Sequence, residues 1–189
     1  GNARHAYNRV ADSVRALVAA WNVETGRTDQ TLAAALASAS DAFCQLTALA
    51  PRAASGSVSA WYLVNRLAQY AEETALIVPG MTDAIACGDA DAAGALMARS
   101  QQMAEDALEN QVPQTVWLAA QARALGAAGA TAFGAGFGGA VWALVANGGA
   151  EEFAKAWVAS YRAVYGAGTS RGQAARVMTP SAGVSRSTS

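Results

Sequence analysis

The chain has 189 residues, of which 53% are hydrophobic and 14% are charged, and its formal net charge is −1. This composition is typical of one globular domain with a well-buried core, and it excludes a disordered chain. The near-neutral charge provides no basic surface for nucleic acid, so we expect no nucleic-acid partner.

Cysteine and histidine are scarce. The chain has two cysteines, Cys44 and Cys87, and one histidine, His5, which leaves little material for a metal site or a histidine-based triad. We expect both thiols to be small buried groups in a reducing cytosol and His5 to lie at the surface.

Polar residues near the N-terminus, among them Arg4 and Arg9, stand where a signal peptide would be apolar, so we expect a cytoplasmic protein. The start at Gly1 without a methionine indicates a fragment or a processed chain.

Helical spacing of apolar residues predicts a run of helices up to Leu125, beginning with the stripe from Tyr7 to Trp21. Short helices are expected at residues 81–86 and 89–109. The other helices are expected to end at Gly26, before Pro51, at Pro79-Gly80 and at Gly126. A cap at Thr28 or Asp29 is expected to start the helix with the stripe from Leu32 to Leu46, the ASGSVS stretch precedes a third helix, and Pro113 lies in the first turn of the last one.

The last third of the chain has a different pattern. GATAF (129–133) and AVWALVA (140–146) predict two short strands, an amphipathic helix follows within 148–166, and ARVMTP (175–180) predicts a last strand before a frayed tail. Helices followed by strand, loop, strand, helix and strand indicate an α+β layer fold.

Five glycines stand in the eleven residues from Gly129 to Gly139, and no charged residue occurs from Ala124 to Ala150. A membrane span is disfavoured because glycines cluster at its centre, and we expect no membrane partner. Two interpretations remain: a turn in which glycine permits positive φ, and a loop whose backbone approaches a ligand closely and cradles an anion. The loop is not a phosphate-binding Walker loop, because no Gly-Lys-Ser/Thr follows.

The segment GATAFGAGFGGAVWALV resembles the third, C-terminal motif of the galactokinase family, within the larger group of galacto-, homoserine, mevalonate and phosphomevalonate (GHMP) kinases. Gly129-Ala130 and the stretch from Gly134 to Gly139 match that motif in place, whereas Thr131, Ala132 and Phe133 replace its polar lead-in. Further segments resemble the family in order: AYNRV (6–10), ACGDADAAGALMARSQ (86–101), with Gln101 in place of histidine, NQVPQTVWLAAQARALGAAGA (110–130) and RVMTPSAGV (176–184).

The resemblance implies the family's α+β C-terminal domain over residues 1–180, an antiparallel sheet with helices packed on it, and a flexible tail at 181–189. It implies an ATP-dependent kinase that phosphorylates a sugar hydroxyl with Mg²⁺. The catalytic Asp and Arg of the family belong to an N-terminal half that is not visible here, so no catalytic residue is expected in this chain, which should be inactive alone. The loop residues expected to shape the ATP and sugar cleft are Gly134, Ala135, Gly136, Phe137, Gly138 and Gly139.

The expected partners are the sugar, ATP and the N-terminal half, and a sheet edge left exposed without that half could drive self-association. Two other interpretations stay open. One is a galactokinase-like protein that senses a sugar without turnover, and the other is a packed domain that serves only as an assembly interface.

Overall fold

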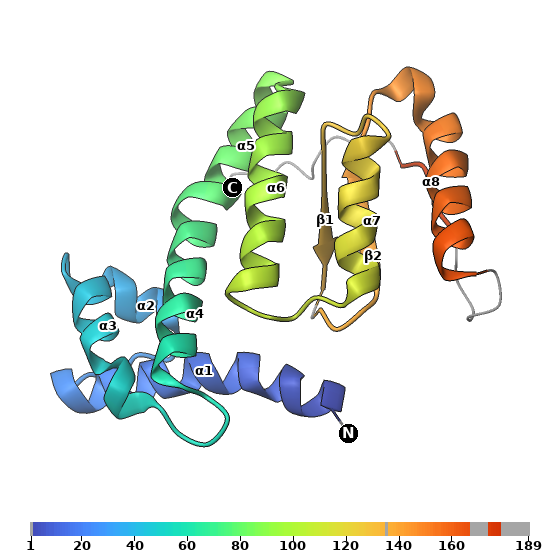
Figure 1. Ribbon diagram of the computed structural model, residues 1–189. Helices are drawn as coiled ribbons and strands as arrows, with labels where there is room; N and C mark the ends of the chain where they lie inside the picture. The colour runs from blue at the N-terminus through green and yellow to red at the C-terminus, as the bar shows by residue number, and fades with distance from the viewer. Residues whose placement is uncertain (1, 135, 167–173, 179–189) are drawn as a thin grey trace, which may run out of the picture.

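In the computed structural model of the chain, helices precede and flank a two-stranded antiparallel sheet (Figure 1). It describes residues 2–134, 136–166 and 174–178, and for residues 2–7 the backbone alone. The elements are α1 (Asn2–Thr25), α2 (Leu32–Ala37), α3 (Ala42–Ala53), α4 (Ala60–Glu72), the π-helical turn η1 (Glu73–Ile77), α5 (Val78–Cys87), α6 (Ala90–Asp106), α7 (Pro113–Ala124), β1 (Gly129–Phe133), β2 (Ala140–Leu144), the 3₁₀ turn η2 (Asn147–Gly149) and α8 (Ala150–Tyr165). This architecture confirms the α+β class predicted from the sequence.

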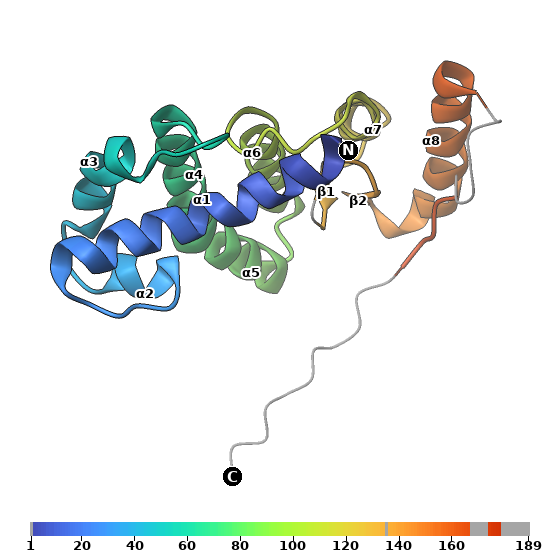
Figure 2. The ribbon, with the colours of Figure 1, turned by 90° about the horizontal axis from the view of Figure 1, so that it is seen from below.

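The first four helices enclose one hydrophobic cluster. Its buried members include Leu17 and Trp21 of α1, Leu46 of α3, and Leu63 and Leu67 of α4. Figure 2 shows α1 running beneath the other helices, with its N-terminal end reaching toward α7. From Val14 to Trp21 the predicted stripe of α1 is therefore a core face, and Gly26 ends the helix with φ +71° as expected.

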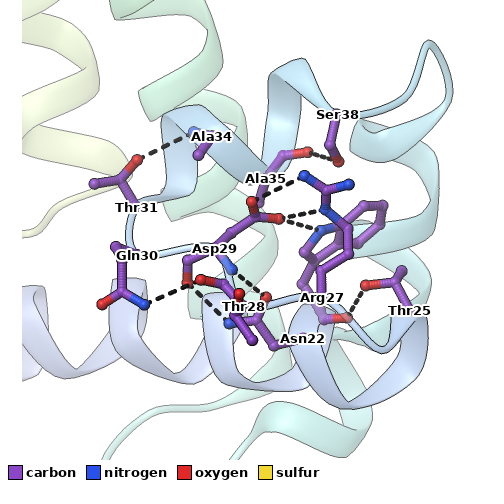
Figure 3. A network of polar contacts seen from close by, with 11 residues as sticks. Asn22, Thr25, Arg27, Thr28, Asp29, Gln30, Thr31, Ala34, Ala35 and Ser38 are labelled. Carbon is purple, nitrogen blue, oxygen red and sulfur yellow. Dashed lines mark hydrogen bonds and ion pairs between the residues drawn. The ribbon is translucent and has the colours of Figure 1, made fainter.

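A polar network fixes the connection between α1 and α2 (Figure 3). The Asp29 carboxylate accepts hydrogen bonds from Arg27 Nε (2.7 Å) and Trp21 Nε1 (3.1 Å). Because Asp29 is engaged in this way, it does not cap α2, and neither does Thr28. The cap is Thr31, whose hydroxyl accepts from the Ala34 N–H at 3.1 Å. The cap expected at Thr28 or Asp29 was therefore placed three or two residues too early.

Three helix predictions in this half are wrong. Pro51 was expected to end a helix but lies inside α3, which continues to Ala53. The single stripe from Leu32 to Leu46 is divided between α2 and α3, because Ser38 ends α2 with its hydroxyl bonded to the Ala35 carbonyl. Pro79 does not end a helix either: α4 continues through η1 into α5, and Pro79 lies in the first turn of α5. The wider π-helical turn just before the proline accommodates its ring and its missing N–H, which an α-helical interior does not.

The sheet region forms a second cluster. Ala119 and Ala122 of α7, Ala130 of β1 and Trp157 of α8 are buried together, and the Trp157 indole donates to the Leu118 carbonyl at 3.1 Å. The two strands and α8 lie where the sequence predicted them. The last predicted strand does not form in its described part, since residues 174–178 have no regular structure and pair with neither strand. Thr179 and Pro180, and the tail expected at 181–189, lie outside the described residues.

The described helices also bear on a membrane span and on the two thiols. Within the described residues, no helix is long and apolar enough to cross a bilayer. Both cysteines are exposed, which corrects the prediction of buried thiols: Cys44 lies on α3 and Cys87 at the last residue of α5. Their helices bury other faces, so the thiols add nothing to either core.

Candidate functional site

The backbones of α6 and β1 approach each other at two glycines, and this contact sets the position of the glycine loop. A Cβ on Gly94 would lie 1.9 Å from the Ala128 carbonyl oxygen, and one on Gly129 would lie 2.6 Å from the Gly94 Cα. Real side chains never come so close, so both positions require glycine. Met97, which is 1% exposed, packs beside the contact.

Gln101 of α6 joins the helix to the same strand one turn further on. Its Oε1 accepts from the Ala132 backbone N–H at 2.7 Å and from the Thr131 hydroxyl at 3.2 Å, and its Nε2 donates to Glu105 at 2.7 Å. The side chain is 2% exposed, so these bonds are shielded from water. The Ala132 N–H of β1 therefore donates to a side chain of α6 and not to another strand.

The glycine loop connects β1 to β2 and has an unusual backbone. Gly134, Gly136, Gly138 and Gly139 all have positive φ, between +81° and +116°, and Phe137 has φ +60°. Non-glycine residues rarely adopt this region. A Cβ on Gly134, Gly138 or Gly139 would meet nothing within 4 Å, so these backbones border open space.

Gly136 is the exception, because it is in tight contact with Asn110. A Cβ at Gly136 would lie 2.4 Å from the Asn110 carbonyl oxygen and 2.6 Å from its Cγ. The next residue, Phe137, donates its backbone N–H to that same carbonyl at 2.5 Å. Asn110 is 6% exposed. The loop is thus pinned at one point while its other glycines stay open.

Asn110 belongs to the turn of residues 107–112 between α6 and α7, and two helices of the first cluster hold this turn. Arg9 of α1 forms an ion pair with Glu109 (2.9 Å), and its guanidinium carbon lies 4.3 Å from the centre of the Tyr62 ring. The Tyr62 hydroxyl donates to the Leu108 carbonyl at 3.2 Å. Burial raises the pKa of Tyr62, which keeps this hydroxyl protonated and able to donate.

The other side of the turn is fixed by α7. Thr115 donates its hydroxyl to Gln111 Oε1 (2.9 Å) and accepts from the Val112 N–H (3.2 Å), while Gln111 Nε2 donates to Asn110 Oδ1 (2.8 Å). Pro113 occupies the first turn of α7, as predicted. The turn is therefore held from both sides before it contacts the loop.

Of the predicted site residues, the structure brings together Gly134, Gly136, Phe137, Gly138 and Gly139 in one loop, and Ala135 lies outside the described residues. The sequence pattern assigns no functional role to Asn110 or Glu109: it places Asn110 in a break between helices and Glu109 at the end of the helix expected at 89–109, whereas α6 ends at Asp106. The available signal was the tight break itself, which places Glu109 at φ +49°. In the described part of the chain no group of three or more His, Cys, Asp or Glu side chains could hold a metal ion.

Comparison with known proteins agrees with this arrangement. Residues 81–163 match the family model described as the C-terminal domain of GHMP kinases. The chain is similar in structure to the galactokinase of Lactococcus lactis, solved in complex with galactose, with a TM-score of 0.62 and 22% identity. That similarity covers 88% of this chain and 39% of the galactokinase chain. No curated protein sequence matches.

The matched region contains α6, α7, both strands and the glycine loop. The match shows a segment similar to the C-terminal domain of GHMP kinases at residues 81–163, which is less than half of the chain. This family consists of kinase-type transferases that use ATP, typically with Mg²⁺. At 22% identity the structural similarity to the galactokinase establishes the fold alone.

Proposed function

We propose that this chain is the C-terminal part of an ATP-dependent sugar kinase resembling galactokinase, which phosphorylates a hexose hydroxyl in the cytoplasm. The glycine loop at 134–139 carries the proposal. It is pinned to Asn110 at Gly136 and Phe137, and its remaining described glycines border open space. A backbone held in this way can lie directly against a ligand without a side chain between them.

Phosphoryl transfer depends on positioning and on charge stabilisation more than on covalent help from the protein. In our proposal the loop contributes positioning: Gly138 and Gly139 present backbone to the cleft, Gly136 seats the loop on the turn, and Phe137 packs behind it. Consecutive backbone N–H groups at positive φ are suited to phosphate oxygens. Ala135 completes the loop in the proposal.

The described residues offer no cluster of metal ligands, so this part of the chain does not fit a magnesium site, and no step is assigned to the metal here. The catalytic Asp and Arg and the phosphate loop are assigned to an N-terminal half, and residues 1–180 act as one domain beside it. We therefore expect the 189 residues alone to be inactive. Among the described residues no third strand pairs with β2, whose free edge is available to that half or to a second copy.

The proposal is tested by measuring ADP release from the protein expressed from its complete reading frame, across a panel of hexoses with ATP and Mg²⁺. Sugar-dependent release supports the kinase and identifies its sugar. Sugar binding without ADP release favours the sensing protein considered above. A protein that neither binds a hexose nor releases ADP contradicts the proposal.

A further inference from the structure

The ion pair between Arg9 and Glu109 connects the helical half of the chain to the glycine loop. Arg9 lies on α1 and Glu109 in the turn before α7, directly before Asn110, which seats the loop. The connection runs from Arg9 to Glu109, through the backbone to Asn110, and from the Asn110 carbonyl to the Phe137 N–H. Each step is a direct contact or a neighbouring residue.

Burial and stacking hold the Arg9 side chain in this connection. The Arg9 side chain is 22% exposed and stacks on Tyr62, which is itself 2% exposed. Within the described residues the buried Nε of Arg9 has no hydrogen-bond partner, so the guanidinium is held by Glu109 and by the Tyr62 ring. Glu109 has φ +49°, a strained backbone conformation that persists only where its surroundings hold it.

We propose that Arg9 is a positioning residue for the glycine loop: by pairing with Glu109 it holds Asn110 in the place that fixes Gly136 and Phe137. The Arg9 guanidinium pairs with Glu109 and stacks on Tyr62, neither of which belongs to the loop, so in this proposal it acts through the turn. In the proposed kinase, which this part of the inference rests on, Arg9 sets the loop geometry for turnover although it lies outside the loop motif.

The first test needs no enzymatic activity. Hydrogen exchange at the Phe137 amide is measured by NMR on the 189-residue chain and on the variant Arg9→Gln. We expect exchange to speed up by about fivefold, the factor corresponding to the upper end of the range for partly exposed ion pairs. The Ala128 amide, which donates to the Leu144 carbonyl at 2.8 Å in the same region, should be unchanged.

A second ion pair that involves α1 provides a matched control. Arg52 of α3 pairs with Glu24 of α1, also at 2.9 Å, and contacts neither the turn nor the loop. Arg52→Gln should leave Phe137 exchange as it is in the parent chain. Unchanged Phe137 exchange in Arg9→Gln, or equal acceleration at Ala128, overturns the proposal.

The second test uses the complete protein with its sugar and ATP. Arg9→Gln should lower kcat by about fivefold, Arg9→Lys by less, and Arg52→Gln not at all, at similar thermal stability of the two glutamine variants. An unchanged kcat in Arg9→Gln overturns the link to turnover. If no sugar gives ADP release in the parent protein, the proposed function fails, while the amide measurement still decides the structural link.

Discussion

Replacing Gly94 by alanine tests the close contact between α6 and β1. Alanine favours a helix over glycine by up to about 1 kcal/mol, so the substitution should stabilise an ordinary helix interior. Here the new Cβ would lie 1.9 Å from the Ala128 carbonyl oxygen, far short of the roughly 3.5 Å at which non-bonded heavy atoms attract one another. The obstacle is backbone, so it cannot rotate away.

The overlap places the cost at the top of the usual range for overpacking, about 3 kcal/mol. After the helical gain is subtracted, we expect Gly94→Ala to lower the free energy of unfolding by about 2 kcal/mol. The assay is urea unfolding of the 189-residue chain followed by far-UV circular dichroism, with the slope m compared between variants.

Gly80→Ala is the matched control. Gly80 is also helical, and its Cβ would meet the end of the flexible Leu96 side chain at 3.2 Å, which can move aside. We expect its unfolding free energy to lie within about 1 kcal/mol of the parent chain. If Gly94→Ala is as stable as Gly80→Ala, the account of the α6–β1 contact is refuted.

Three other predictions concern the polar contacts and the thiols. Gln101→Leu removes the acceptor of two shielded hydrogen bonds, so urea unfolding should show a loss of about 2 kcal/mol, and a loss near zero would contradict its role. A hydrogen bond from Arg27 holds the pKa of Asp29 below its usual range, so its contribution to stability is present above about pH 4 and is lost as the pH falls through the lowered pKa. Asp29→Asn should therefore flatten the acid side of the plot of Tm against pH, and an unchanged slope would argue against the pair. Cys44 and Cys87 should both react with a thiol reagent in the native chain, and fewer than two reactive thiols would contradict their exposure.

Local signals in the sequence predicted much of the fold correctly. Pro113 and Gly126 mark the start and end of α7, and the two strands lie at the expected residues around the glycines. These features are determined by residues that are close together in the chain, so a single sequence is enough to predict them. The error at Pro79 has a different origin, because a π-helical turn that accommodates a proline has no simple sequence pattern.

The candidate site was predictable only in part. The glycine pattern and its resemblance to a known motif indicated the loop, because positive φ is a local demand. Asn110 and Arg9 were not found, since their contacts with the loop and the turn join residues that are distant in the chain. Such contacts are decided by packing of helices against one another, which spacing and propensity do not encode.

The most direct measurement is the turnover of Gly136→Val in the protein from the complete reading frame, with Gly148→Val as control. Gly148 lies in η2 with nothing within 4 Å of its Cβ position, so its variant should keep full turnover. In Gly136→Val the side chain would enter the space of Asn110 and the positive φ would be strained. The account predicts that Gly136→Val loses sugar-dependent ADP release while its far-UV circular dichroism stays near that of the parent. Normal turnover in Gly136→Val would contradict the claim that the glycine loop belongs to the active site.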